Sequence, residues 1–286
     1  MKVFVTGYKG MLGSDLMVRL RSEGHDIKSS DIDTLDICNL NAVLESLDKY
    51  RPDVIINCAA YTNVDGCESD IDNAFKVNAI GPKNLAIASN RFDVPLLHIS
   101  TDYIFDGETD KPYLEGDFAN PQSIYGKSKF SGEENIRSLT NKYFILRTQW
   151  LYGKHGKNFV KTMLSLAEKN SVLTVVNDQF GSPTYTKDLS DVICEIIKTH
   201  SYGTYHVTNS GICSWYEFTK CIMKLAKIDI EVKSCTTKEF PRPAKRPKYA
   251  PLENFNLRLC NFKALRHFEE ALKEYLNETL FKEKLQ

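Results

Sequence analysis

The chain has 286 residues, which is long enough for a large buried core, and we expect two lobes. Its 37 basic and 37 acidic side chains cancel, and the lack of a basic block argues against nucleic acid or an anionic membrane as partner. No apolar run approaches about 18 residues, so no membrane-spanning helix is expected.

The start of the chain and its cysteines predict a cytoplasmic protein. Residues 1–4 lead directly into an apolar strand, without the pattern of a signal peptide. The eight cysteines include no C-x-x-C pair, which favours reduced, mostly buried thiols. The six histidines lack the spacing of metal ligands, so we expect no structural metal.

The first element is a short β-branched strand, residues 2–6, followed by a glycine turn and a helix over residues 14–22. In this context Gly7 permits a tight turn, Gly10 lets the backbone approach a pyrophosphate, and Gly13 lets the helix lie close to the sheet. The pyrophosphate would then sit at the positive end of the helix. The spacing is G-x-x-G-x-x-G, and the plainer alternative is a turn without a ligand.

The second predicted strand, residues 26–30, bears on the choice of cofactor. It ends at Asp31, which lies 18 residues (31 − 13) past the last glycine. An acid near this position commonly binds the ribose 2′-hydroxyl and disfavours a 2′-phosphate, which favours NADH. Asp33 could take the same role, whereas Lys9 or Lys28 could favour NADPH, and Asp31 could be an ordinary loop acid.

Residues 52–61 predict a third, fully buried strand that ends in Cys58-Ala59-Ala60-Tyr61. Small residues at the carboxyl end of a parallel strand leave room for a flat ligand. A helix over residues 72–90 and strands over 95–101 and 144–148 follow. This alternation predicts a doubly wound, Rossmann-like parallel sheet, with an NAD(P)-binding domain over residues 1–152.

Between the last two of these strands lies Tyr125-x-x-x-Lys129, which places a phenol and an ammonium one helical turn apart. A neighbouring cation favours the phenolate, so the tyrosine becomes a usable proton donor and acceptor. A second copy, residues 216–220, follows a capping box that begins at Ser214, and we interpret it as an amphipathic helix surface. Only Tyr125 follows a complete nucleotide-binding half and a strand that ends in Ser100-Thr101.

The second half of the chain predicts a smaller lobe, residues 153–286, interleaved with the first and covering the carboxyl edge of the sheet. A strand near residues 203–208 is expected to return to the main sheet, so residues 186–210 would complete the first domain. The other expected elements are helices over 158–170, 186–200 and 214–227, a strand over 173–177, an irregular proline-rich basic segment over 241–251, and a final helix.

Taken in order, these motifs resemble the extended short-chain dehydrogenases and, among them, the dTDP-4-dehydrorhamnose reductase family. The resemblance covers nearly the whole chain and rests on the glycine turn and residues 57–62, 100–107, 125–129, 146–153, 177–184 and 246–247. It implies reduction of the C4 ketone of a nucleotide-linked 6-deoxy sugar, dTDP-4-dehydro-L-rhamnose, by NADH or NADPH. The nucleotide sugar would be the partner.

The residues also support a mechanism that agrees with the family. Nicotinamide would lie near Ala59 and Ala60 and present hydride to C4. Tyr125 would protonate the carbonyl oxygen, general acid catalysis that is worth about 10²–10⁴-fold. Lys129 should lower the pKa of the phenol and bind the nicotinamide ribose, and Thr101 should donate a hydrogen bond to the same oxygen. Thr101 could instead merely cap the end of its strand.

The remaining expected contacts fall into two sets. For the cofactor, besides Tyr125 and Lys129, we expect Gly7, Gly10, Met11, Leu12, Gly13, Asp31, Asp36, Ile37, Cys58, Ala59, Ala60 and Tyr61. For the substrate, the resemblance implies Thr62, Val64, Thr101, Asp102, Tyr103, Trp150 and Arg246, the last as a guanidinium for the diphosphate. Trp150 could equally be a core aromatic, and Arg246 part of a solvated basic loop.

Several alternatives remain open. A 4,6-dehydratase would carry Asp-Glu after the threonine, whereas this chain has Asp102-Tyr103. Another sugar-nucleotide 4-ketoreductase, a 4-epimerase or a non-catalytic NAD(P)-binding regulatory subunit would each retain much of the pattern. Some family members dimerise around Mg²⁺; here Asp15 could serve as one ligand, but Lys187 stands where another acid is expected, so Mg²⁺ and a homodimer stay open.

Overall fold

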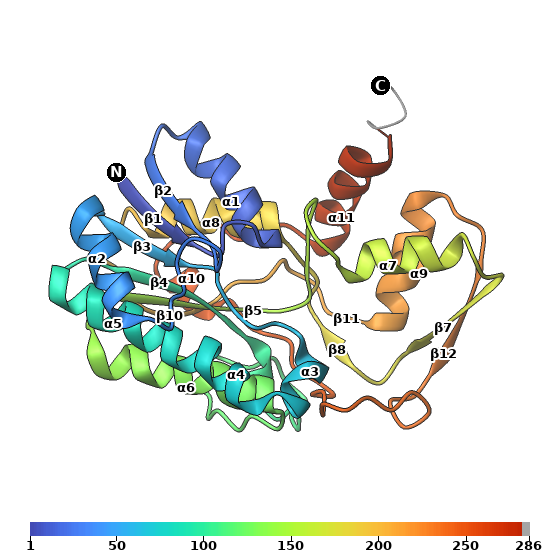
Figure 1. Ribbon diagram of the computed structural model, residues 1–286. Coiled ribbons are helices and arrows are strands. Elements are labelled where there is room, and N and C mark those ends of the chain that lie inside the picture. Colours follow the sequence, from blue (N-terminus) through green and yellow to red (C-terminus); the bar gives the residue numbers. More distant parts are fainter. Residues whose placement is uncertain (282–286) are drawn as a thin grey trace.

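A computed structural model describes residues 1–281, and its centre is a six-stranded parallel sheet (Figure 1). The strand order is β10-β5-β4-β3-β1-β2, with every neighbouring pair parallel. The strands are β1 Lys2–Thr6, β2 Asp26–Ser30, β3 Val54–Asn57, β4 Leu96–Thr101, β5 Tyr143–Thr148 and β10 Gly203–His206. The predicted doubly wound sheet is confirmed, and the chain returns to it through β10.

Helices cover both faces because successive residues of a buried strand point to opposite sides. Val3 and Val5 pack against the side of α1 (Met11–Ser22) and α8 (Thr186–Ile196), whereas Phe4 packs on the opposite side. That opposite side is covered by α2 (Leu40–Tyr50), α5 (Gly81–Phe92) and α6 (Ile124–Leu139). In Figure 1, α1 and α8 lie above the sheet and α5 and α6 below it.

The helix predicted over residues 72–90 is interrupted by a π-helical turn. It consists of α4 (Ile71–Phe75), the turn Lys76–Ile80 and α5, and it follows the short helix α3 (Val64–Ser69). The turn brings Asn78 inwards, where its amide bonds both the N–H and the carbonyl of Tyr61 and the hydroxyl of Ser128. The π turn therefore fixes the loop after β3 against α6, as such turns often do near functional sites.

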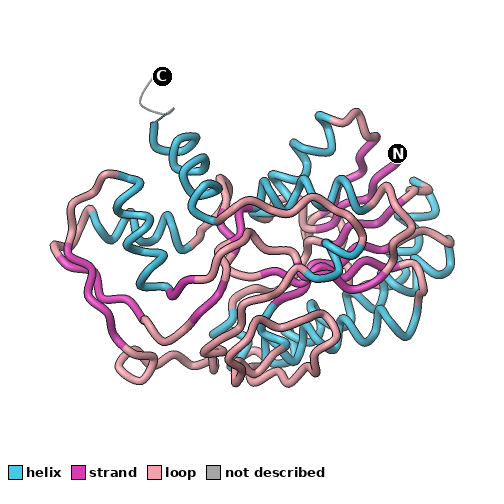
Figure 2. Tube along the Cα trace, turned by 180° about the vertical axis from the view of Figure 1, so that it is seen from behind, coloured by secondary structure: helices cyan, strands magenta, loops and turns pink. Residues whose placement is uncertain are grey.

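The second lobe is built around a small parallel ribbon of β7 (Val172–Val176) and β12 (Glu231–Cys235). Figure 2, seen from behind, shows this ribbon far from the main sheet and joined to it by loops. Helices α7 (Phe159–Ala167), α9 (Trp215–Ala226) and α11 (Phe268–Leu276) enclose an aromatic core that includes Tyr152, Tyr185 and Phe218. The predicted capping box at the start of α9 is confirmed, because Ser214 and Glu217 bond each other's backbone N–H.

The remaining elements are short. They are the strand pairs β6 (Leu151–Tyr152) with β9 (Thr184–Tyr185) and β8 (Phe180–Gly181) with β11 (Cys213–Ser214), the 3-10 turn Asp102–Ile104, α10 (Phe255–Leu259) and a final π-helical turn over Asn277–Phe281. Among the described residues, no helix combines the length and apolar character needed to cross a membrane.

Candidate active site

The glycine turn after β1 is shaped by close backbone contacts. Gly7 has φ of 71°, and a Cβ at this position would lie 2.5 Å from the backbone nitrogen of Ala59. A Cβ on Gly13 would lie 2.7 Å from the Cα of Tyr8 and closer still to the carbonyl oxygen of Gly7. Because Gly7 and Gly13 have no Cβ, α1 can begin directly against the turn, and the turn can contact the loop after β3.

The start of α1 suits an anionic ligand. Gly10 is its N-cap residue, no side chain caps it, and its first turn holds no acid. The first backbone N–H groups of a helix have no partner within the helix, and its dipole favours negative charge there. An uncapped helix start beside a turn whose glycines have no Cβ fits the pyrophosphate of a dinucleotide.

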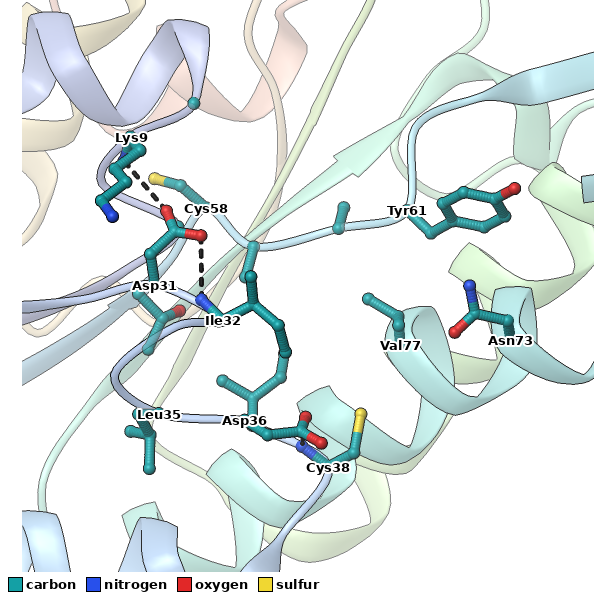
Figure 3. A pocket seen from close by; sticks show the side chains of 16 residues that line it. Lys9, Asp31, Ile32, Leu35, Asp36, Cys38, Cys58, Tyr61, Asn73 and Val77 are labelled. Carbon is teal, nitrogen blue, oxygen red and sulfur yellow. Dashed lines mark hydrogen bonds between the residues drawn. The ribbon is translucent and has the colours of Figure 1, made fainter. Parts of the chain in front are cut away.

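A cleft of about 550 Å³ opens beside this turn, at the carboxyl ends of β1, β2 and β3 (Figure 3). Of the residues expected to bind cofactor, it is lined by Gly7, Gly10, Asp31, Asp36, Ile37, Cys58, Ala59, Ala60 and Tyr61. Asp31 accepts hydrogen bonds from the backbone nitrogens of Lys9 (3.0 Å) and Ile32 (2.9 Å), which fix its carboxylate at the rim (Figure 3). Lys9 Nζ pairs with Asp33 at 2.5 Å, so one residue weighed for NADPH and one weighed for NADH neutralise each other.

A second cleft, of about 440 Å³, adjoins the first and shares Gly10, Cys58 and Ala60 with it. It brings together the other predicted residues of the glycine turn, the three predicted catalytic residues and most of those expected to bind substrate: Met11, Leu12, Gly13, Thr62, Val64, Thr101, Asp102, Tyr103, Tyr125, Lys129 and Trp150. These residues come from the ends of β3, β4 and β5 and from α1, α3 and α6, so the edge of the sheet brings distant segments of the chain together.

Tyr125 lies in the first turn of α6, whose N-cap Ser123 accepts a hydrogen bond from the backbone nitrogen of Gly126 (3.1 Å). Its side chain is only 9% exposed, and the ring of Tyr103 stands edge-on to it, with centroids 5.4 Å apart. Burial raises the pKa of Tyr125, while a hydrogen bond with Thr101 acts in the opposite direction. The phenol is therefore neutral near pH 7, which is the form that donates a proton.

Lys129 lies one turn further along α6 and is 2% exposed. Its Nζ donates to the carbonyl oxygen of Ile99 at 2.5 Å and lies 3.2 Å from Nε2 of His98. Burial lowers the pKa of Lys129 to about 8. Lys129 was expected to lower the pKa of the Tyr125 phenol. Burial is instead the main influence on both groups, since it raises the pKa of Tyr125 and lowers the pKa of Lys129.

Thr101 caps the turn that follows its strand, and its bond to the ketone oxygen stays a prediction. Its hydroxyl accepts from the backbone nitrogen of Tyr103 (3.3 Å), which caps the 3-10 turn, and donates to the carboxylate of Asp102 (2.9 Å). It also lines the cleft beside Tyr125. Burial raises the pKa of Asp102 to about 7, with the Thr101 bond opposing that shift.

A buried ion pair that sequence reasoning missed lies behind the cleft. Glu133, on α6, is fully buried and pairs with Arg147 of β5 (2.8 Å) and Arg137 (2.7 Å). It also accepts a hydrogen bond from Ser100, the neighbour of Thr101. Burial alone would raise the pKa of Glu133, but the two guanidiniums lower it, so the carboxylate stays charged and ties α6 to the strand ends.

Trp150 is both a wall of the cleft and part of an aromatic stack. It has φ of 49° and stacks on Trp215 of α9, with ring centroids 3.5 Å apart. The left-handed backbone turns the chain from β5 towards the second lobe, and the stack links the two lobes at this point.

Arg246 is the predicted substrate residue that the structure does not bring into either cleft. Its guanidinium pairs with Asp65 of α3 through two bonds, of 2.8 and 3.1 Å, and Arg242 pairs with the same carboxylate at 2.7 Å. Although burial acts the other way, these bonds lower the pKa of Asp65 to about 2. A role for Arg246 towards a diphosphate stays a prediction.

Other lining residues were not among those predicted to bind cofactor or substrate. They are Thr6, Lys9, Ile32, Leu35, Cys38, Asn73 and Val77 in the first cleft and Ile99, Ser100, Thr148, Gln149, Leu151 and Lys157 in the second. Their strand-end positions next to predicted residues could have marked several of them.

The positions considered for Mg²⁺ are occupied by other interactions. Lys187 pairs with Glu274 and, at 2.9 Å, with Glu278, while Asp15 accepts a hydrogen bond from Thr186. Within residues 1–281 no three histidine, cysteine, aspartate or glutamate side chains gather as a metal site would require.

Comparison with known proteins gives a consistent result. The family model of the RmlD substrate binding domain matches residues 1–281. The spore coat polysaccharide biosynthesis protein SpsK of Bacillus subtilis is 44% identical over 277 residues, 97% of each chain.

Two solved structures are similar over almost their full length. A dTDP-4-dehydrorhamnose reductase from Clostridium acetobutylicum is 48% identical, with a TM-score of 0.95, over 97% of this chain and 99% of that one. A dTDP-4-dehydrorhamnose reductase from Bacillus anthracis, solved in complex with NADP, is 45% identical with the same TM-score and coverage.

Proposed function

The chain belongs to the RmlD substrate binding domain family, and from this premise we propose that it reduces the C4 ketone of dTDP-4-dehydro-L-rhamnose to give dTDP-L-rhamnose. It is an NAD(P)H-dependent oxidoreductase. The observation that carries the proposal is the convergence of Tyr125, Lys129 and Thr101 in the cleft that adjoins the glycine turn. A ketone in that cleft would lie beside a proton donor and beside the start of α1, where the cofactor's pyrophosphate fits.

NAD(P)H, when bound, supplies the hydride that adds to C4. The chain's own task is to place the ketone and to deliver one proton to its oxygen. Tyr125 donates its phenolic proton as negative charge grows on that oxygen, and a buried neutral phenol is held in the state needed for this step. The Thr101 hydroxyl can stabilise the same charge if it turns its one proton from Asp102 to the oxygen, while the bond from Tyr103 N–H keeps its Oγ in place. Solvent then returns a proton to Tyr125, so the balance is one hydride and one proton added to the ketone.

We also propose that the two lobes bind different ligands. Residues 1–152, with 186–210, hold the cofactor, and residues 153–286 mainly hold the sugar nucleotide. Trp150 at the junction and Lys157 beyond it both line the second cleft, which supports this division.

The test is consumption of NADH and of NADPH by the purified chain with dTDP-4-dehydro-L-rhamnose, next to Tyr125→Phe. Stoichiometric oxidation that Tyr125→Phe reduces at least about 10²-fold, while the variant still binds cofactor, supports the reductase. The same assay decides the cofactor preference that Asp31 was expected to set. Tight cofactor binding without consumption would refute the proposal and favour an epimerase, another ketosugar substrate or a regulatory role.

A further inference from the structure

The loop over residues 153–157, which leads into α7, lies against the first turns of α1. Asn158, the N-cap residue of α7, directs its Nδ2 at the sulfur of Met11, 3.9 Å away. One turn further along α1, Asp15 lies 3.7 Å from Nε2 of His155. A loop of the second lobe therefore reaches the start of the helix where the cofactor's pyrophosphate is expected.

This loop is held in its shape by bonds to its own backbone. Nζ of Lys161 donates to the carbonyl oxygens of Lys154 (2.6 Å) and Gly156 (3.2 Å), and Nδ2 of Asn158 donates to the carbonyl oxygen of Gly153 (2.8 Å). Because the backbone is already ordered, a side chain on this loop that binds a ligand loses mainly its own rotamer freedom.

Lys157 is the residue of this loop that lines the second cleft, together with residues 10–13. Three cationic side chains line the two clefts, and two of them are engaged: Lys9 pairs with Asp33 at 2.5 Å, and the buried Lys129 donates to a backbone carbonyl at 2.5 Å. Lys157 is exposed, and no acid within residues 1–281 forms an ion pair with it. Its ammonium is therefore available to an anion in the cleft.

The start of α1 leaves part of a pyrophosphate's charge unbalanced. Each phosphate carries negative charge, whereas a helix start supplies only about half an elementary positive charge. The first residues of α1, Met11 to Ser14, include no charged side chain. An ammonium close to the phosphate oxygens would add charge-assisted hydrogen bonds to those of the backbone N–H groups.

We propose that Lys157 is a further cofactor-binding residue, whose ammonium reaches from the second lobe to the pyrophosphate of NAD(P)H at the start of α1. The inference rests on the proposed function for the identity of the ligand. The second lobe, which mainly holds the sugar nucleotide, would thus contribute one contact to the cofactor, and the bound cofactor would hold the loop over residues 153–157 against α1.

The charge of Lys157 can be tested by NADH binding to the full chain, without turnover. Lys157→Met removes the charge and keeps most of the side chain's length. NADH fluorescence titration should show binding about three- to tenfold weaker than that of the wild type at about 0.02 M salt. The difference should shrink to about twofold or less at about 1 M salt, where screening acts over about 3 Å.

Two variants serve as controls. Lys157→Arg keeps the charge and should bind NADH within about twofold of the wild type. Lys154→Met removes a charge from the same loop, but Lys154 lines neither cleft, so NADH affinity should not change. Urea unfolding of all three variants without cofactor should match that of the wild type, because the two lysines are exposed.

Two further ligands separate the cofactor's pyrophosphate from the diphosphate of the sugar nucleotide. ADP-ribose has the pyrophosphate but no nicotinamide, and Lys157→Met should weaken its binding by the same factor as that of NADH. Binding of dTDP should be unchanged. An equal or larger loss for dTDP would assign the lysine to the sugar nucleotide and overturn the proposal.

Unchanged NADH affinity in Lys157→Met, next to an active wild type, would refute this inference alone. A wild type that binds NADH through Lys157 but does not oxidise it with dTDP-4-dehydro-L-rhamnose would instead refute the proposed function and leave the cofactor contact standing.

Discussion

Gly7→Ala is the sharpest test of how the cofactor cleft is built, because the chain holds a matched control. Gly7 and Gly24 have nearly the same backbone, with φ of 71° and 74°, but a Cβ on Gly24 would meet nothing within 4 Å. Alanine at either site pays about 1–2 kcal/mol for the left-handed conformation. At Gly7, by contrast, the new Cβ would lie 2.5 Å from the backbone nitrogen of Ala59. Because Cβ atoms do not approach other heavy atoms more closely than about 3.0 Å, the loop after β3 must move by about 0.5 Å.

We expect this movement to cost a further 1–3 kcal/mol or so of unfolding free energy, the usual range for overpacking. Urea unfolding should therefore show Gly7→Ala less stable than Gly24→Ala by that margin. NAD(P)H fluorescence titration should show affinity about tenfold lower for every 1.4 kcal/mol that the distortion removes from binding. Gly24→Ala should bind cofactor like the wild type. Equal destabilisation by the two changes, with normal cofactor binding by Gly7→Ala, would refute the assignment of the turn.

Three further predictions concern charged residues. Glu133→Gln leaves the buried Arg147 guanidinium without a carboxylate and should cost about 3–5 kcal/mol in urea unfolding. Glu134→Gln, on the exposed side of the same helix, should cost no more than about 0.5 kcal/mol, and similar losses would contradict the buried pair. The pKa of Lys129 is about 8 in the folded chain, below its ordinary 10.5, so between these pH values the unfolded chain binds more protons than the folded chain. The unfolding free energy of the wild type relative to Lys129→Met should therefore rise with pH across this window, by about 3 kcal/mol in total. A difference in unfolding free energy that does not change with pH would count against a buried, titrating lysine. If Arg246 exchanges Asp65 for the diphosphate, Arg246→Ala should raise KM about tenfold with kcat unchanged, and an unchanged KM would assign the arginine to the Asp65 pair alone.

The parts of this fold that the sequence predicted are those with a local signal. The strand, glycine turn and helix of residues 2–22 follow from apolar periodicity and from glycines where a Cβ has no room. The buried strands β3 to β5 are short apolar runs, and the end of each strand marks the edge where ligands bind. The predicted cleft residues lie together for this reason, since parallel strands place their carboxyl ends at one edge.

The parts that the sequence did not predict depend on distant partners. Strand β12 has an exposed, mostly polar pattern and exists because β7, about 60 residues earlier, pairs with it. The π turn at Lys76–Ile80 carries an ordinary helical pattern, and its reason is the bond from Asn78 to Tyr61. The pairing of Arg246 had no signal in the sequence because its partner, Asp65, lies 181 positions away.

Hydride delivery to C4 at the Tyr125 site is the central claim, and isotope transfer tests it most directly. The chain would be given dTDP-4-dehydro-L-rhamnose and NAD(P)H carrying deuterium at both C4 positions of the nicotinamide, and the sugar product would be analysed by mass spectrometry and NMR. One deuterium at C4 of the sugar for each cofactor oxidised, with transfer largely lost in Tyr125→Phe, is the predicted result. A sugar without deuterium, or label at a carbon other than C4, would contradict the account.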